Sequence, residues 1–205
     1  FINEKDKLNP ISNYGRSKLL AEKIIQNHKN IKYVILRFFN VSGCIANPLI
    51  GEFHNPETHL IPISVYKAIK GNPINIFGKK YSTKDGTCIR DYVHIKDICS
   101  AIKRSINYMK KNNSIILNIG SGHGTSNKEV ITKLRKVLKK QIKINYKNIR
   151  EGDHPRLVCS IKKAKKILKW SPKFSKIQNI IKDEIIWSKF LINKKIFRKY
   201  QSVQK

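Results

Sequence analysis

Acidic side chains are scarce in this sequence: 13 Asp and Glu stand against 43 Lys and Arg, which gives the 205 residues a formal net charge of +30. Such an excess predicts affinity for polyanions, either nucleic acid or an anionic membrane surface. The basic residues are nevertheless spread along the chain, and few are arginine, the type that phosphate clamping and base readout favour. Lys, Asn and Ile all have A/T-rich codons, so we attribute the charge to compositional drift. We expect no specific nucleic-acid partner and no membrane partner.

Long apolar runs and closely spaced cysteines are also missing. No stretch approaches the roughly 20 apolar residues that span a bilayer, and no apolar signal segment opens the chain. The cysteines lie far apart and form no C-x-x-C pair, which argues against a zinc site and a disulfide framework. These features favour a reducing compartment, and we expect a cytoplasmic protein.

An initiator methionine and a glycine-rich dinucleotide loop are absent as well. The sequence starts at Phe1, so we expect a fragment or an incomplete gene product. The nearest approach to a dinucleotide loop is residues 120–124, whose spacing is G-x-G-x-G. No acidic residue suited to a ribose follows about 20 residues later. We interpret this segment as a tight strand-to-helix turn.

Two hydrophobic periodicities alternate along the chain. Helical spacing is found at residues 14–28, 60–70, 96–110, 161–169 and 175–192. Ser126 followed by Glu129 is a capping box that would open a further helix. Strand-like runs occupy residues 33–39, 74–78, 114–120 and 142–147, whereas 40–58 is expected to be a loop and 79–94 largely irregular. Strands that alternate with helices predict an α/β fold with some parallel sheet.

Tyr14 and Lys18 have the spacing of residues that share a site. Residues four apart lie on one face of a helix, and a nearby ammonium favours the ionised phenolate electrostatically. Such a pair can take a proton from a sugar hydroxyl while a nicotinamide takes the hydride. The pattern is also common in ordinary helices, where it means a half-buried tyrosine and a solvated lysine.

Further segments stand in an order that narrows the interpretation. They are N-Y-G-R-S-K at 13–18, L-R-F-F-N-V-S-G at 36–43, E-T-H-L-I-P at 57–62, I-F-G at 76–78, D-G-T-C-I-R-D-Y-V-H at 85–94 and R-E-G-D at 150–153. Together they closely resemble the UDP-glucose 4-epimerases of the extended short-chain dehydrogenase/reductase family. The resemblance runs from about residue 3 to about residue 190. It corresponds to the C-terminal part of such an enzyme, without the first strands and the glycine-rich NAD loop.

The resemblance implies the C-terminal part of a Rossmann-like dehydrogenase fold with its smaller substrate-binding α/β lobe. Residues 1–45 would complete the NAD-binding domain, and residues 46–192 would form mainly the UDP-sugar-binding lobe. A segment at about 79–112 would return to the Rossmann domain. Residues 193–205 would be a basic, frayed tail.

The resemblance also implies an activity, the interconversion of UDP-galactose and UDP-glucose in galactose metabolism. The sugar C4 would be oxidised to a ketone with NAD and then reduced on its opposite face. Tyr14 would be the general base, and Lys18 would bind the ribose hydroxyls of NAD. Phe39 would lie near the nicotinamide and Asn40 would contact the sugar, although strand core and a strand-end turn are their plainer roles. A homodimer through helices near Tyr14 is expected.

The remaining implied contacts are with the UDP-sugar. A helix start suits phosphate at His59 and Leu60, and guanidinium geometry suits a diphosphate at Arg90 and Arg150. Phe77 could stack on uracil. The full implied set is Asn40, His59, Leu60, Asn75, Ile76, Phe77, Arg90, Arg150, Glu151, Gly152, Asp153 and Leu157. A small residue at the position of Leu157 is associated with N-acetylated sugars, so these are also possible substrates.

Three residues near Arg90 are expected to be structural. His94 would brace a turn by hydrogen bonding, and Asp91 and Tyr92 would support Arg90. The other histidines lack the spacing of metal ligands, so no metal is expected.

Two alternatives stay open. Other nucleotide-sugar epimerases, dehydratases and decarboxylases of the same family keep the Tyr–Lys pair, and the Ser or Thr that works beside it would precede residue 1. A degenerate basic domain that binds polyanions would be a different class of protein. Because the NAD loop and this Ser or Thr are missing, we expect the isolated chain neither to bind NAD firmly nor to turn over UDP-sugars.

Overall fold

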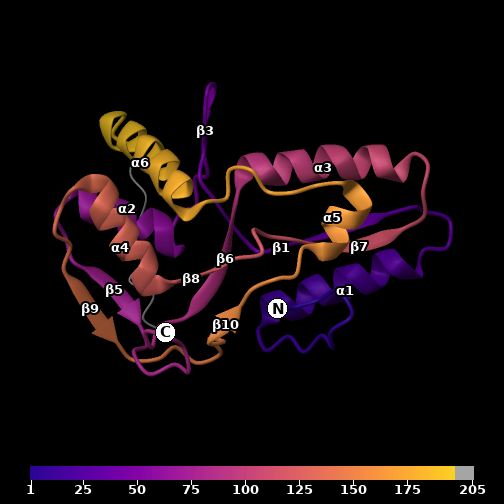
Figure 1. The fold of residues 1–205 in the computed structure, drawn as a ribbon, viewed down its shortest axis with the longest axis horizontal. Helices are drawn as coiled ribbons and strands as arrows, with labels where there is room; N and C mark the ends of the chain where they lie inside the picture. Colours follow the sequence, from indigo (N-terminus) through magenta and orange to yellow (C-terminus); the bar gives the residue numbers. More distant parts are fainter. Residues whose placement is uncertain (197–205) are drawn as a thin grey trace.

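Helices and strands alternate in the computed structural model, which describes residues 1–196 (Figure 1). The helices are α1 (Asn13–Asn27), α2 (Leu60–Ile69), α3 (Ile95–Met109), α4 (Asn127–Leu138), α5 (Lys162–Leu168) and α6 (Ile177–Asn193). The strands are β1 (Val34–Phe38), β2 (Asn40–Ser42), β3 (Ile45–Ala46), β4 (Leu49–Ile50), β5 (Ile74–Phe77), β6 (Ile89–His94), β7 (Ile115–Ile119), β8 (Gly124–Ser126), β9 (Ile144–Lys147) and β10 (Arg156–Leu157). The predicted α/β fold and each predicted helix are confirmed, and most of the tail beyond α6 lies outside the described residues.

Strand β6 runs through the segment expected to be irregular, and that expectation is wrong. Asp91, Tyr92, Val93 and His94 are all buried. A strand buried on both sides shows no alternation of apolar and polar residues. In β6 an Asp and a His also interrupt the apolar run from which a buried strand would be predicted. The segment 40–58 likewise holds β2, β3 and β4, and the turn at 120–124 leads into β8 before α4 begins.

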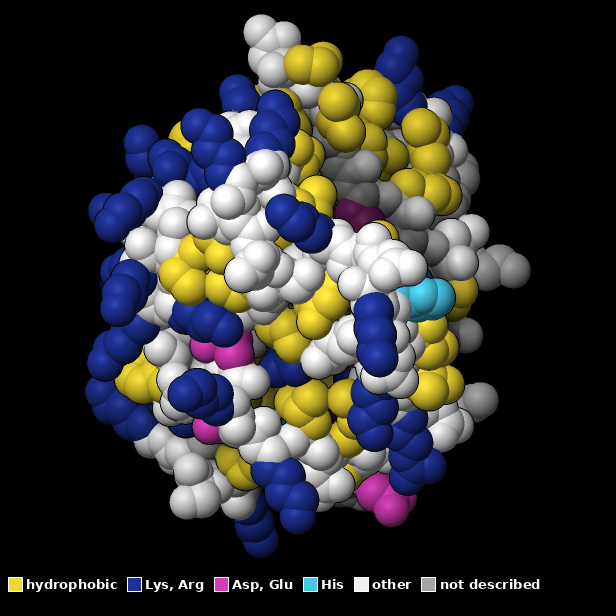
Figure 2. Space-filling model, turned by 90° about the vertical axis from the view of Figure 1, so that its right-hand side faces the viewer, with side chains coloured by type: hydrophobic (Ala, Val, Ile, Leu, Met, Phe, Trp, Pro, Cys, Tyr) yellow, Lys and Arg dark blue, Asp and Glu magenta, His cyan; other side chains and the backbone are white. Residues whose placement is uncertain are grey.

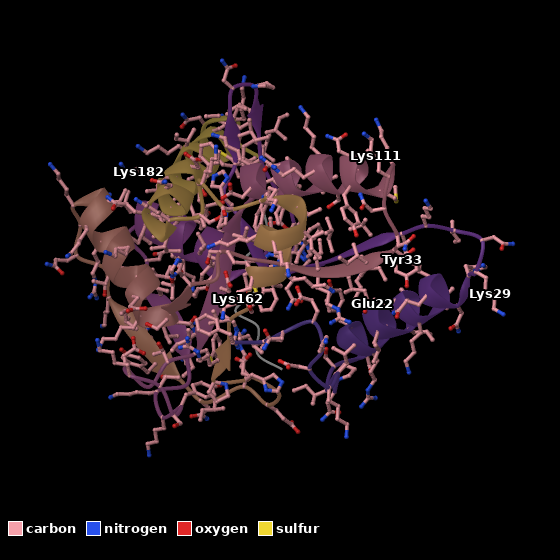
Figure 3. The ribbon with its side chains drawn as sticks, turned by 45° about the vertical axis from the view of Figure 1, so that its right-hand side comes forward. Glu22, Lys29, Tyr33, Lys111, Lys162 and Lys182 are labelled. Atoms are coloured by element: carbon pink, nitrogen blue, oxygen red, sulfur yellow. The ribbon has the colours of Figure 1, made fainter. Side chains whose placement is uncertain are left out.

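One half of the molecule is built around two parallel strands. Strand β1 pairs with β7 over its whole length, with α3 and α5 on one face of the pair and α1 on the other (Figure 1). The carboxylate of Glu22, which is labelled on α1 in Figure 3, accepts two hydrogen bonds, of 2.9 and 2.7 Å, from the Arg37 guanidinium of β1. The buried members of this core are Val93, Ile98, Ala101, Leu117, Ile119, Cys159, Ile161, Ala164, Leu168 and Trp170.

The other half packs α2, α4 and α6 against the parallel strands β5 and β9 (Figure 1). Its largest fully buried side chains are Ile61, Ile74, Ile76, Ile131, Leu134, Ile180 and Ile181. The predicted capping box is confirmed at the start of α4: Ser126 Oγ accepts from the Glu129 N–H, and the Glu129 carboxylate accepts from the Ser126 N–H. These two cores support the expected two-part organisation, whose boundaries stay a prediction.

Strand β6 joins the two halves. It pairs with β2, β8 and β10, and its neighbouring residues Tyr92 and Val93 belong to different cores. His94 braces the junction by hydrogen bonding, as predicted: Nδ1 accepts from the Lys96 N–H and caps α3, while Nε2 lies 2.9 Å from an Asp183 carboxylate oxygen of α6.

Asp91 does not support Arg90, and that expectation is wrong, whereas the expectation for Tyr92 stays a prediction. Successive side chains of a strand point to opposite faces, so Asp91 points away from Arg90. Its buried carboxylate instead accepts hydrogen bonds from Ser121 and Gly122 in the turn 120–124 and from the Cys159 N–H.

The surface agrees with the composition. On the face shown in Figure 2, Lys and Arg side chains lie all around the molecule with apolar atoms between them, rather than in one patch. Within residues 1–196 no helix is both long and apolar enough to cross a bilayer. The cysteines are unpaired, with Cys44, Cys88 and Cys159 buried and Cys99 exposed.

Candidate functional site

Three adjoining cavities follow the seam between the two halves. The first has a volume of about 880 Å³, the second about 190 Å³ and the third about 90 Å³. Asn40 and His59 line both the first and the second, while Leu60, Arg150 and Asp153 line both the second and the third. The shared walls make one groove that runs from Tyr14 to Phe77.

Tyr14 enters the first cavity from the first turn of α1. Ser12 begins this helix, its hydroxyl accepting from the Gly15 N–H at 3.1 Å. The Tyr14 side chain is 73% exposed and faces the cavity, and Lys18 Nζ lies 5.3 Å from the centre of its ring. The spacing of four therefore places both groups together, with the ammonium over the phenol rather than in the cavity wall.

The carboxyl end of β1 forms the floor of the same cavity. Phe38, Phe39 and Asn40 line it, at the position where open parallel sheets bind ligands. Leu157 also lines this cavity. It comes from β10, which lies beside β6, where Leu157 pairs with Arg90. A phenol, an amide and apolar side chains thus surround a space large enough for a sugar and a flat ring.

The second cavity meets the start of α2. Glu57 is fully buried, and its Oε1 accepts from the N–H groups of Thr58 and His59 and lies 2.8 Å from His59 Nδ1. An anion at this helix start would therefore meet the N–H groups of Leu60 and Ile61, since Pro62 has none.

Two arginines line the far end of the groove. Arg90 Nη2 pairs with Asp153 Oδ1 at 3.1 Å, and its Nη1 donates to the His154 carbonyl at 2.7 Å. The Arg150 guanidinium lies 3.6 Å above the ring of Phe77, and its buried Nε has no hydrogen-bond partner within residues 1–196. Arg150 thus keeps a donor unused, whereas Arg90 is largely committed to the protein.

A family model described as the NAD dependent epimerase/dehydratase family matches residues 2–120, more than half of the chain. The chain belongs to this family. It is 39% identical over 178 residues to a UDP-glucose 4-epimerase of Rhizobium meliloti and 40% identical over 193 residues to one of Lactobacillus helveticus. These matches cover 84% and 92% of this chain but only 54% and 58% of the two relatives. The chain thus spans little more than half the length of the curated relatives.

A solved structure has the same fold. The crystal structure of UDP-glucose 4-epimerase from Bifidobacterium longum in complex with NAD⁺ and UDP superimposes with a TM-score of 0.87 at 29% identity, over 94% of this chain and 59% of that one. The arrangement of helices and strands in this epimerase/dehydratase family member is therefore that of a UDP-glucose 4-epimerase over the part they share.

Not every residue expected at the site lines the groove. Asn75 lines the third cavity, but the side chain of Ile76 is fully buried in the core between α2, α4 and α6. Glu151 and Gly152 form the turn that places Asp153, with Gly152 at a φ of 79°, and neither lines any of these three cavities. The roles implied for these residues stay predictions.

Several lining residues of this family member escaped the sequence analysis. Ser42, Thr58, Asn127 and Glu184 line the groove. Ser42 follows Asn40 by two, which on a strand means the same face, so this spacing could have found it. Its buried hydroxyl has no hydrogen-bond partner in the described part of the chain. Asn127 and Glu184 come from α4 and α6, and no local signal links them to the others.

The buried thiols of Cys44 and Cys159 are poor nucleophiles. Burial, reinforced by the nearby Asp183 and Glu184 carboxylates, raises the pKa of Cys44 to about 11. Burial and Asp91 raise the pKa of Cys159 as well. Neither of these two thiols is ionised near neutral pH, so neither is an activated nucleophile.

Proposed function

We propose that this chain forms the UDP-sugar-binding side of a UDP-glucose 4-epimerase that uses NAD and interconverts UDP-galactose and UDP-glucose. The observation that supports it is the groove, which joins Tyr14 at one end to Arg150 and Phe77 at the other. A diphosphate sugar has this shape, with a reacting ring at one end and a base at the other. The names of the relatives and of the structure bound to NAD⁺ and UDP agree with it.

The side chains of the first cavity fit the reacting end of such a complex. The Tyr14 phenolate would accept the proton of the sugar 4-hydroxyl and return it later, and the Lys18 ammonium 5.3 Å from the ring centre would stabilise its charge. Asn40 would hold the sugar through its amide. NAD supplies a hydride acceptor and donor, and the apolar surfaces of Phe38 and Phe39 fit its flat ring.

The nucleotide end would be held by the residues of the second and third cavities. The unused Nε of Arg150 is a donor for a phosphate oxygen. His59, Leu60, Arg90 and Asp153 would complete the diphosphate and ribose contacts. Because Arg150 covers one face of Phe77, uracil would meet the ring edge or the opposite face.

The substrate range and the assembly belong to the same proposal. Leu157 lies in the wall of the first cavity, where its size would decide whether an N-acetyl group is admitted. Leu20 and Ile24 lie one turn apart on α1 and are 59% and 53% exposed, which favours a homodimer through this helix. The cytoplasmic location stays a prediction.

Calorimetric titration of UDP into the full chain tests the nucleotide site. Arg150→Ala should weaken UDP binding about tenfold or more, because a charge-assisted hydrogen bond contributes about 1.5–3 kcal/mol. Lys162→Ala, which removes the same charge from α5 (Figure 3), should leave the affinity unchanged. Equal loss in both variants, or no saturable binding to the parent chain, would contradict the assignment.

A further inference from the structure

The segment between β4 and α2 gathers two carboxylates around a histidine in the wall of the groove. Glu52, Glu57 and His59 each bring one atom of the type that binds metals to within 4.8 Å of the others. His59 Nδ1 lies 2.8 Å from Glu57 Oε1 and 3.7 Å from Glu52 Oε1. Histidine spacing alone predicted no metal, but the folded chain adds carboxylates to a histidine. Imidazole nitrogen and carboxylate oxygen are ligand atoms of zinc in proteins.

The separations suit one small cation. Zinc binds nitrogen and oxygen at about 2.0–2.2 Å, so the ligand atoms of a tetrahedral site lie about 3.4 Å apart. The two separations from His59 Nδ1 fall on either side of this value. A zinc ion would take the place of the proton between His59 and Glu57, and this proton would move to Nε2 of the ring or to solvent. Glu52, whose side chain is half exposed, can close the remaining gap.

Contacts with the rest of the fold hold the cluster in place. The Glu57 carboxylate accepts from the N–H groups of Thr58 and His59, at 2.8 and 2.9 Å. The indole N–H of Trp187 on α6 donates to the Glu52 carbonyl at 2.7 Å. The first two bonds orient a carboxylate as outer hydrogen bonds orient the ligands of metal sites. The third fixes the stretch of chain that carries Glu52.

The charge of the first cavity favours a cation. Within the described part of the chain, its lining includes Glu52 and Glu184 but no Lys or Arg, although the sequence has 43 of these basic residues. The two carboxylates of the cluster match the charge of a divalent ion. The start of α2 opposes this ion with only about half an elementary charge. Because the side chains of Glu52 and His59 are half exposed and line the cavity, a cation can reach them from solvent.

We propose that Glu52, Glu57 and His59 bind one zinc ion in the wall of the groove, with a fourth coordination position left for water. Zinc sites with three protein ligands keep such an open position, whereas structural sites with four do not. The bound ion links the segment after β4 to the start of α2. This assignment goes beyond the proposed function and does not rest on it.

Calorimetric titration of zinc chloride into the full chain tests the site. The chain is first treated with EDTA and dialysed into a buffer that does not bind metals, at about 0.3 M NaCl. We expect saturable binding of one zinc ion per chain. Magnesium chloride at the same concentrations should not bind measurably, because magnesium prefers octahedral sites made of oxygen.

Single substitutions locate the ion. Glu52→Gln preserves the size of an exposed side chain, so the variant should fold, and it should bind zinc at least about tenfold more weakly. His59→Ala should show a loss of the same order. Two controls remove other exposed zinc ligands: His28→Ala after α1 and Cys99→Ser on α3 should leave the zinc affinity unchanged.

Each outcome decides the assignment. Zinc binding that persists in Glu52→Gln and His59→Ala, or that is lost in either control, would place the ion elsewhere and overturn the site. A parent chain without saturable zinc binding, or one that binds magnesium equally well, would overturn it too. The readout does not involve UDP, so failure of the zinc site and failure of the epimerase assignment are distinguishable.

Discussion

At the scale of single residues, one buried carboxylate connects three segments that lie far apart in the sequence. Asp91 is fully buried and accepts hydrogen bonds of 2.6 Å from both the N–H and the hydroxyl of Ser121. It also binds the N–H groups of Gly122 and Cys159. It thereby ties the turn after β7 and the segment after β10 to β6.

Asp91→Ala should lower the free energy of unfolding by about 3–5 kcal/mol, since several buried donors lose their acceptor at once. Urea unfolding at neutral pH measures the change. Asp6→Asn, at an exposed carboxylate, should stay within about 0.5 kcal/mol of the parent. If the two variants proved equally stable, the Asp91 network would contribute little.

At the scale of elements, the start of α4 depends on a residue far away in the sequence. The Ser126 hydroxyl that caps the helix also donates to Asp85 Oδ2 at 2.5 Å. Burial tends to raise the pKa of the Asp85 carboxyl, but hydrogen bonds from Ser126 and Thr87 outweigh it and hold the pKa below its usual 3.8. The ionised form is therefore the one that the folded chain prefers.

Asp85→Asn should destabilise the chain by about 1–2 kcal/mol at pH 7. A carboxyl with a lowered folded-state pKa stabilises above its unfolded pKa, and this contribution disappears as the pH falls through the folded pKa. The difference in the free energy of unfolding between Asp85→Asn and the parent chain should thus shrink as the pH falls from about 5 to about 3. Denaturant unfolding across this range measures it, with Glu151→Gln as an exposed control; a pH-independent difference would refute the role of the charge.

The sequence alone predicted those elements that have one apolar and one polar face, because this spacing is visible within a few neighbouring residues. The apolar spacing of α3 and the capping box of α4 are visible within a few residues, and both helices are present. Strand β6 was missed because Asp91 and His94 are buried through partners that lie 30 or more residues away. Within the site, the spacing of Tyr14 and Lys18 was sufficient to predict that the two side chains lie together. Asn127, in contrast, reaches the groove only through the packing of α4, which no local pattern predicts.

At the scale of the whole molecule, the net charge of +30 should attract polyanions to the surface without specificity, in addition to any binding in the groove. Surface lysines bind polyanions by releasing counterions, so the affinity for DNA should fall steeply with salt. UDP in the groove neutralises few charges. Between 50 mM and 300 mM NaCl we expect DNA binding to weaken about a hundredfold or more, and UDP binding less than about tenfold.

Fluorescence anisotropy with labelled duplex DNA, alongside UDP calorimetry, measures both dependences. Displacement of the DNA by UDP at equal ionic strength would indicate one shared basic surface. DNA binding that persists at the higher salt would instead mean contacts beyond charge neutralisation, and would favour a nucleic-acid-binding module over the epimerase assignment.

Strand β6 has a consequence for how substitutions spread through the molecule. Tyr92 packs in the core with α2, α4 and α6, and its neighbour Val93 packs in the core with α3 and α5. Arg90 and Tyr92 of the same strand line the groove. The strand is thus shared by both cores and also forms part of the wall of the binding site. A methyl group removed from either core should therefore shift groove residues as well, so we expect substitutions in one half to be felt in the binding site and in the other half.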